Sequence, residues 1–386
     1  MKFLKTAAYA LLICLSFQNC SKKAEEKKEE NAVEQTAARE IWTKQQAKDW
    51  YAKQGWLVGA DFLPSTAINQ LEMFQEASFD TATINRELGW AAGIGMNTMR
   101  VYLHDLLYQQ DSAGFLKRLD VFLDITSKHK IKPIFVLFDS CWDPFPKLGK
   151  QRDPKPGVHN SGWVQSPGFN ALKDSTQYPR LERYVKGTIA AFANDDRVLA
   201  WDIWNEPDNT NESSYGKIEL PKKVDYVLPL MEDAFGWARS VNPSQPLTAG
   251  IWAGDWTSHE TLKPIEKVSI DESDVISFHN YNDAQEFEKR IKQLQQYDRP
   301  MICTEYMSRG NNSFFEGSLP VAKKYNVGAI NWGLVNGKSQ TIYPWDSWKK
   351  TYTSEPKLWF HDIFQKDGKP YRQAEVDLIK KLTASR

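Results

Sequence analysis

Short apolar runs recur along the chain and are separated by longer amphipathic stretches. Each run is bounded by polar residues or by glycine and proline, which is typical of buried strands. The run 198–207 is the clearest, because it ends at Asn205-Glu206-Pro207 and proline cannot continue a strand ladder. We predict strands at 56–62, 98–103, 133–138, 198–207, 247–251, 275–279, 300–305 and 328–332.

The stretches between these runs carry apolar residues three and four positions apart, which predicts helices. One helix begins after Asp80, a good N-cap residue, and places Ile84, Leu88 and Ala91 on one face. Further helices are predicted near 115–123, 181–192, 224–241, 285–296, 319–325 and 374–382. Strands that alternate with helices in this way predict an α/β fold, a (β/α)8 TIM barrel, as a single domain over residues 41–386.

Six of the predicted strands change from apolar to polar at their carboxyl ends. One such ending is usually a solvated loop start, but in a barrel all of these ends open onto one rim, where active sites lie. Six polar endings on one rim therefore indicate a shared site. The endings are Asp61, His104-Asp105, Asp139, Asn205-Glu206, His279-Asn280-Tyr281 and Glu305-Tyr306.

The first forty residues are not expected to belong to the barrel. Residues 1–20 have a short basic start and an apolar run too short to span a bilayer, ending at Cys20, as in a bacterial lipoprotein signal. An ordinary secretory peptide with an incidental cysteine is the alternative. Residues 21–40 are mostly charged and small, which predicts a flexible tether. We expect a protein exported and held by a lipid on Cys20 at the periplasmic or cell-surface face of a bacterial membrane.

Composition restricts the partners. Lys plus Arg and Asp plus Glu both number 49, so the chain has no electrostatic footprint for nucleic acid and no polybasic membrane patch. The 15 tryptophans suit a carbohydrate, whose apolar faces stack on aromatic rings. The six histidines are scattered, so no metal and no cofactor is expected. Cys141 and Cys303 lie on different predicted strands and are expected to be separate buried thiols. We expect a monomer.

Two carboxylates at strand ends across a barrel mouth suit hydrolysis of a glycosidic bond, in which one gives a proton and the other attacks the anomeric carbon. Arg100 would favour the ionised form of Glu305. Tyr281 could donate a hydrogen bond to the same carboxylate, and Asn205 could hold a sugar hydroxyl. Trp332 could form an apolar floor beneath the sugar ring. The alternatives are a structural ion pair for Arg100 and a core aromatic for Trp332.

These motifs resemble the clan A glycoside hydrolases, and glycoside hydrolase family 5 most closely. The resemblance rests on Asn205-Glu206-Pro207, Thr304-Glu305-Tyr306, the spacing of His279 and Tyr281, Arg100 and Trp332. It implies that Glu206 is the acid/base and Glu305 the nucleophile, with retention of configuration. The chain departs from the family at the end of the third strand, where Asp139-Ser140-Cys141-Trp142 replaces the usual histidine.

The resemblance thus implies a retaining hydrolase of β-linked oligo- or polysaccharides that works by double displacement. A direct attack by Glu305 leaves no room for a water molecule, so the carboxylate oxygens should lie about 5–5.5 Å apart. A transglycosylase using the same residues and a non-catalytic carbohydrate-binding lipoprotein are the alternatives. The sequence does not identify the sugar.

The segment from Ser140 to about Asp174 is long for a connection between a strand and a helix. Aromatic residues stand among its prolines and glycines, and they need a place to be buried. We expect Trp142 or Trp163 to wall one end of a sugar-binding cleft, with His159 and Asn160 offering polar contacts. Such a wall would favour release of short sugars from chain ends. A loop that only caps the barrel is the alternative.

Overall fold

The computed structural model describes residues 37–384. Cys20, the predicted signal segment and nearly all of the predicted tether lie outside these residues. The compact unit begins at Ala38, slightly before the predicted boundary, because Arg39 Nη2 pairs with Asp274 Oδ2 at 2.6 Å. Among the described residues, no helix is both long and apolar enough to cross a bilayer.

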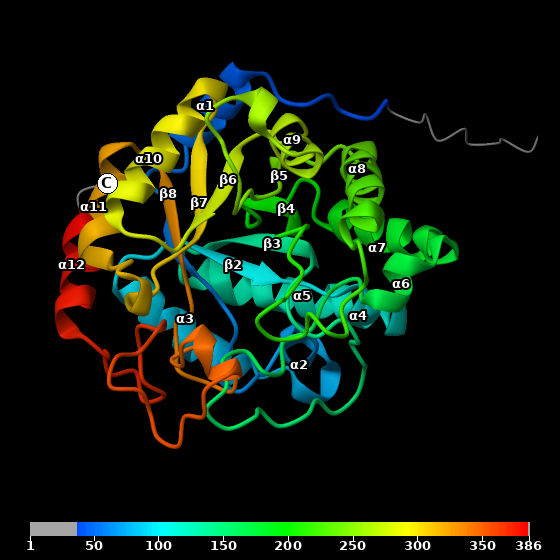
Figure 1. Cartoon of the computed structure of the whole chain (residues 1–386). Helices are drawn as coiled ribbons and strands as arrows, with labels where there is room; N and C mark the ends of the chain where they lie inside the picture. The colour runs from blue at the N-terminus through cyan, green and yellow to red at the C-terminus, as the bar shows by residue number, and fades with distance from the viewer. Residues whose placement is uncertain (1–36, 385–386) are drawn as a thin grey trace, which may run out of the picture. The chain divides into compact units, whose positions relative to one another are not determined.

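Eight parallel strands form the predicted barrel (Figure 1). Their order in the sheet is β5-β4-β3-β2-β1-β8-β7-β6. The ring closes between its two ends, where Ile251 forms an isolated parallel bridge with Phe278. The strands are β1 Val58–Asp61, β2 Thr98–Tyr102, β3 Lys132–Asp139, β4 Ala200–Asn205, β5 Leu247–Thr248, β6 Ile276–Asn280, β7 Met301–Tyr306 and β8 Gly328–Trp332.

The predicted helices are confirmed and cover the outside of the strands (Figure 1). Asp80 caps the first of them as expected, accepting a hydrogen bond from the backbone N–H of Thr83. Several helices were not predicted, among them the one between β5 and β6. The helices are α1 Lys44–Ala52, α2 Gln70–Phe74, α3 Thr81–Gly93, α4 Asp105–Gln110, α5 Ser112–Lys128, α6 Phe169–Lys173, α7 Tyr178–Ala191, α8 Val224–Ser240, α9 Pro264–Asp271, α10 Ala284–Leu294, α11 Phe315–Lys324 and α12 Gln373–Thr383.

Helix α1 packs against the amino-terminal end of the barrel. Its buried residues Ala47 and Tyr51 contact a small apolar cluster that includes Leu57, Ile134 and Ile302. This end of the barrel is therefore filled with hydrocarbon, and the polar residues of the interior are left to the carboxyl-terminal end.

Strand β1 tolerates only a glycine at its centre, because Gly59 lies beside Thr98 of β2 and a Cβ there would overlap the Thr98 carbonyl oxygen. We expect Gly59→Ala to lower the free energy of unfolding by about 1–3 kcal/mol through overpacking. Gly93→Ala is the matched control, because nothing lies within 4 Å of its Cβ position in α3. That change should stabilise by about 0.5–1 kcal/mol. Urea unfolding of both variants would measure the difference, and equal stabilities would contradict the close approach.

Candidate active site

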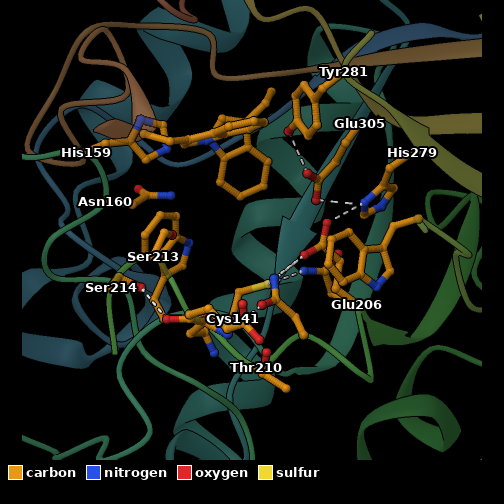
Figure 2. A pocket seen from close by; sticks show the side chains of 18 of the residues that line it. Cys141, His159, Asn160, Glu206, Thr210, Ser213, Ser214, His279, Tyr281 and Glu305 are labelled. Atoms are coloured by element: carbon orange, nitrogen blue, oxygen red, sulfur yellow. Dashed lines mark hydrogen bonds and ion pairs between the residues drawn. The ribbon is translucent and has the colours of Figure 1, made fainter. Parts of the chain in front are cut away.

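A cavity of about 630 Å³ opens at the carboxyl ends of the strands. Figure 2 shows Glu206, Glu305 and His279 together on one side of it, with His159 and Asn160 on the opposite side. Its lining includes nine residues predicted for a sugar site. They are Trp142, His159, Asn160, Asn205, Glu206, His279, Tyr281, Glu305 and Trp332.

The two carboxylates lie close to each other at the base of this cavity. Glu206 follows β4 with a φ of 43°, a left-handed conformation that non-glycine residues rarely adopt and that is often found at functional sites. Glu305 lies within β7. One oxygen of each carboxylate and one ring nitrogen of His279 lie within 4.8 Å of one another. The two oxygens are thus slightly closer than the expected separation of about 5–5.5 Å and well below the roughly 6.5–9.5 Å of an inverting enzyme.

Among residues 37–384, Glu206, His279 and Glu305 are the one group of three side chains close enough to hold a metal ion. The histidine lies between the two carboxylates. Its Nδ1 is 2.9 Å from Glu206 Oε1, and its Nε2 is 3.7 Å from Glu305 Oε1. Each carboxylate is also engaged by neighbouring protein donors.

Glu305 is oriented by three donors. Arg100 Nη1 and the Tyr102 hydroxyl both donate to Oε1 at 2.9 Å, and the Tyr281 hydroxyl donates to Oε2 at 2.6 Å. Burial, followed by the charge of Glu305, raises the pKa of Tyr281 well above its ordinary value, so the phenol keeps its proton and remains a donor. The predicted contacts of Arg100 and Tyr281 with Glu305 are present.

Arg100 is fully buried and ties Glu305 to three other strands. Its Nη1 lies 3.1 Å from Asp61 Oδ1 on β1 and its Nε lies 2.9 Å from Asp202 Oδ2 on β4. Its Nη2 donates to Asn205 Oδ1 at 2.7 Å. Burial raises the pKa values of Asp61 and Asp202, and the positive charge of Arg100 opposes this rise.

Glu206 has a different set of neighbours. Asn209 Nδ2 donates to its Oε2 at 2.6 Å, and the Cys141 thiol donates to the same oxygen at 3.2 Å. Burial by itself would raise the pKa of Glu206, but the hydrogen bond and charge of His279, with these two donors, outweigh it and lower the pKa. Burial, then the charge of Glu206, raises the pKa of the Cys141 thiol, so it remains a neutral donor.

Three predicted contact residues lie behind the cavity instead of lining it. Asp61 pairs with Arg100, as described above. Asp139 Oδ1 accepts from Asn205 Nδ2 at 2.9 Å, and Asp139 Oδ2 accepts from Trp163 Nε1 at 2.6 Å. Burial raises the pKa of Asp139 to about 6 despite these donors. These residues position others and do not face the space for a sugar.

His104 lies outside the cavity, and its predicted sugar contact needs correction. The residue is fully buried and caps α4, where its Nδ1 accepts the backbone N–H of Leu106 at 3.2 Å. A helix that starts directly after β2 was not recognised in the sequence, and this helix turns His104 away from the rim.

Several site residues were missed in the sequence. Tyr102 had a usable signal, because it stands two positions after Arg100 on β2 and so faces the same side of the strand. The others come from connecting segments without any periodicity, and Trp345 begins a short 3-10 helix there. They are Asn209, Trp252, Trp345 and His361. Both remaining cysteines, Cys141 and Cys303, are free and buried, as predicted.

Two loops meet at the side of the cavity opposite the carboxylates. The loop that follows β3 donates to the loop that follows β8, from the backbone N–H groups of His159 to Ser347 Oγ and of Asn160 to the Ser339 carbonyl. Trp348 Nε1 donates in return to the His159 carbonyl at 2.8 Å. The long loop thus folds over the rim and is joined to a second loop. Trp142, His159 and Asn160 line the cavity, whereas Trp163 lies behind it.

Comparison with known proteins finds one family model and one curated relative that match this chain. The model of the Cellulase family, glycosyl hydrolase family 5, matches residues 157–351. Mannan endo-1,4-beta-mannosidase A from Emericella nidulans is 26% identical over 92 residues, which is 24% of this chain and 22% of that relative.

Solved structures share the fold at low sequence identity. A hyperthermostable endo-1,4-beta-D-mannanase from Thermotoga petrophila RKU-1 aligns with a TM-score of 0.54 and 13% identity, over 86% of this chain and 99% of its own. An exo-beta-1,4-mannosidase from Opitutaceae bacterium strain TAV5 aligns with a TM-score of 0.58 and 16% identity, over 85% of this chain and 59% of its own.

The buried Arg100 leads to a prediction about stability. Arg100→Met would leave buried carboxylates without their cation, so we expect the free energy of unfolding at pH 7 to fall by about 3–5 kcal/mol. Burial raises the pKa values of Asp61 and Asp202, so the loss should shrink in acid, where protonation of these two groups removes their unpaired charge. Chemical denaturation at several pH values would measure it.

Arg197→Met is the matched control. Arg197 also pairs with three carboxylates, those of Asp120, Asp124 and Asp195, but at the surface. Exposed pairs contribute little, so this change should cost less than about 1 kcal/mol. If both variants lose the same free energy of unfolding, burial is not the reason that the Arg100 cluster contributes to stability.

Proposed function

The chain belongs to glycosyl hydrolase family 5 and is a glycoside hydrolase, and from this premise we propose that it cleaves β-linked oligo- or polysaccharides by double displacement with retention of configuration. The observation that carries the proposal is the pair of carboxylate oxygens within 4.8 Å. An inverting enzyme needs roughly 6.5–9.5 Å between its carboxyl groups to place a water molecule, and a retaining enzyme does not.

We assign the nucleophile to Glu305. The attacking carboxylate must be ionised and aimed at the anomeric carbon, and donors from Arg100, Tyr102 and Tyr281 hold Glu305 in one orientation. Attack forms a covalent glycosyl-enzyme as the bond to the leaving oxygen breaks. Water then releases the sugar and restores the Glu305 carboxylate.

We assign the acid/base role to Glu206. In the first step it gives a proton to the leaving oxygen, and in the second it takes one from the attacking water. His279 Nδ1, 2.9 Å from Oε1, is placed to share this proton with Glu206. Asn205 is assigned to a sugar hydroxyl and Trp332 to the face of the reacting ring, since both line the cavity beside the carboxylates.

We propose β-1,4-linked mannosides as the first substrates to examine, because the relatives named above are a mannan endo-1,4-beta-mannosidase, an endo-1,4-beta-D-mannanase and an exo-beta-1,4-mannosidase. We also propose that the chain is exported and lipid-anchored through Cys20 and acts as a monomer. The support for export and anchoring is the basic start, the short apolar run and the cysteine in the sequence.

The two carboxylates can be distinguished with aryl β-glycosides. Glu206→Ala should retain activity on substrates with good leaving groups, since these need little proton donation, and added azide should yield a β-glycosyl azide. Glu305→Ala should lose nearly all turnover, and azide should give the α product. NMR of the azide products and of the natural product reads the configuration.

If Glu206→Ala gave the α-glycosyl azide and Glu305→Ala the β-glycosyl azide, the nucleophile and acid/base assignments would have to be exchanged. An α-configured first product from the unmodified enzyme would rule out retention. No hydrolysis of any β-mannoside, β-glucoside, β-xyloside or β-galactoside would favour the non-catalytic carbohydrate-binding alternative. Efficient transfer to added sugar, with little transfer to water, would favour a transglycosylase.

The contacts of Glu206 predict a change in pH dependence. Asn209 donates to the ionised carboxylate, so Asn209→Ala should raise the pKa of Glu206. The acid form would then persist to higher pH, and the alkaline limb of kcat/KM should move upward. Asn85→Ala, an exposed change on α3, is the control and should leave the profile unchanged. If the alkaline limb of the profile does not move in Asn209→Ala, then ionisation of Glu206 does not determine that limb.

A further inference from the structure

Asn160 has a buried amide without a protein partner. The residue is only 1% exposed, and neither its Oδ1 nor its Nδ2 makes a hydrogen bond, although it lines the cavity. Its backbone is held on both sides, because its N–H donates to the Ser339 carbonyl at 2.9 Å and its carbonyl accepts from Trp163 at 3.2 Å. A buried polar group without a hydrogen bond is unfavourable, so a built position of this kind points to a ligand.

Two histidines that line the cavity lie close to each other beside Asn160, with their ring centres 5.4 Å apart. His159 Nδ1 donates to the Tyr343 carbonyl at 2.8 Å, and His361 Nδ1 donates to the Met307 carbonyl at 2.7 Å. Each Nε2 therefore carries a lone pair. Nε2 of His361 is buried without a partner. Burial lowers the pKa of His159 to about 4 and that of His361 well below its usual value, so both rings are neutral.

The chemistry of this group suits neighbouring sugar hydroxyls. An amide offers N–H donors and an acceptor, each histidine offers an acceptor, and a hydroxyl both donates and accepts. No charge is present on Asn160, His159 or His361 to attract an anion. Trp142 and Trp345 also line the cavity and offer aromatic surface for the apolar face of a ring.

The position of the group relates it to the reacting sugar. Asn160 lies with Trp332 along the wall of a neighbouring small cavity, and the His361 ring lies 5.6 Å from that of Tyr281, which holds Glu305. Neither Asn160 nor His361 hydrogen bonds to a catalytic carboxylate. Figure 2 shows Asn160 across the hollow from Glu206 and Glu305, with room between them. Asn209, which donates to Glu206, and Trp252, which donates to Asp208, lie on the Glu206 side instead, where the proposed acid/base meets the leaving group.

We propose that Asn160, His159 and His361 form a subsite that binds the hydroxyl groups of the sugar unit next to the reacting one, on its non-reducing side, and that the wall behind them makes the enzyme act from chain ends. This rests on the proposed function, because Glu305 and Trp332 define where the reacting sugar lies. The wall is the pair of joined loops, in which Asn160 and His159 bond to the segment 339–348. In this proposal the bound sugar chain ends at the joined loops.

Substrate length tests the subsite. An aryl β-monoside fills only the reacting position, whereas an aryl β-bioside also reaches the wall. Asn160→Gly removes the amide and suits the φ of 46°, so the fold should be retained, which a melting curve verifies. We expect kcat/KM on 4-nitrophenyl β-mannobioside to fall about tenfold or more beyond any fall on 4-nitrophenyl β-mannoside. If the screen selects glucosides, the glucoside pair is used.

Asn326→Gly is the matched control. Asn326 has a similar left-handed φ of 51° but is exposed at the end of α11, so the ratio of the two activities should not change. Equal losses on monoside and bioside in Asn160→Gly would overturn the subsite. If activity falls only on substrates extended on the leaving-group side, the subsite binds that side of the sugar chain, and the non-reducing assignment is wrong.

Product analysis tests the action from chain ends. A β-1,4-mannohexaose labelled at its reducing end should be shortened by one constant short step at early times. A broad ladder of labelled fragments would overturn the blocked end. Failure of the inference can be distinguished from failure of the proposed function. An active enzyme with an unchanged ratio of bioside to monoside activity, or with a broad ladder of products, would contradict only the inference. An enzyme with no activity on any β-glycoside would contradict both.

Discussion

The site depends on the cost of burying the guanidinium of Arg100. A buried cation is tolerated only when its neighbours compensate the charge and fill its hydrogen bonds. Carboxylates from β1, β4 and β7 do this together, and Asn205 accepts the remaining donor. The requirement links four strands of the barrel at their carboxyl ends. Glu305 is therefore positioned partly by the same interaction that makes the polar end of the barrel stable, and the hydroxyls of Tyr102 and Tyr281 complete its orientation.

The division of labour between two identical carboxyl groups follows from what donates to each. Glu305 contacts a fixed cation and two phenols. Glu206 contacts an imidazole, an amide and a thiol instead. Cys141 belongs to the segment after the third strand that replaces the histidine usual in the family. That departure supplies a weak neutral donor to Glu206 and leaves the two carboxylates in place.

The strands and the residues on them could be predicted, because a buried strand is a local apolar run and its end is marked by the first polar residues. Strand β5 is shorter than expected, since the Ala249 N–H donates to the side chain of Ser273 at 3.1 Å and leaves the ladder. Helix α9 is short and was missed despite a proline at its start, which is a usual first-turn residue. The first error has its cause in a contact 24 positions along the chain, whereas the second missed a signal that is local.

The wall opposite the carboxylates shows the limit of local signals most clearly. Its composition indicated that the segment after β3 would be buried, but not what would bury it. Gly157 donates to Gln340 across 183 positions of sequence, and the residues on either side have no period to reveal this. Strand ends meet because the barrel brings them to one rim, so the chemistry of the carboxylates is common to many such barrels. The loops after β3 and β8 meet only because their two sequences complement each other. The number of sugar units that the site recognises therefore depends on these loops.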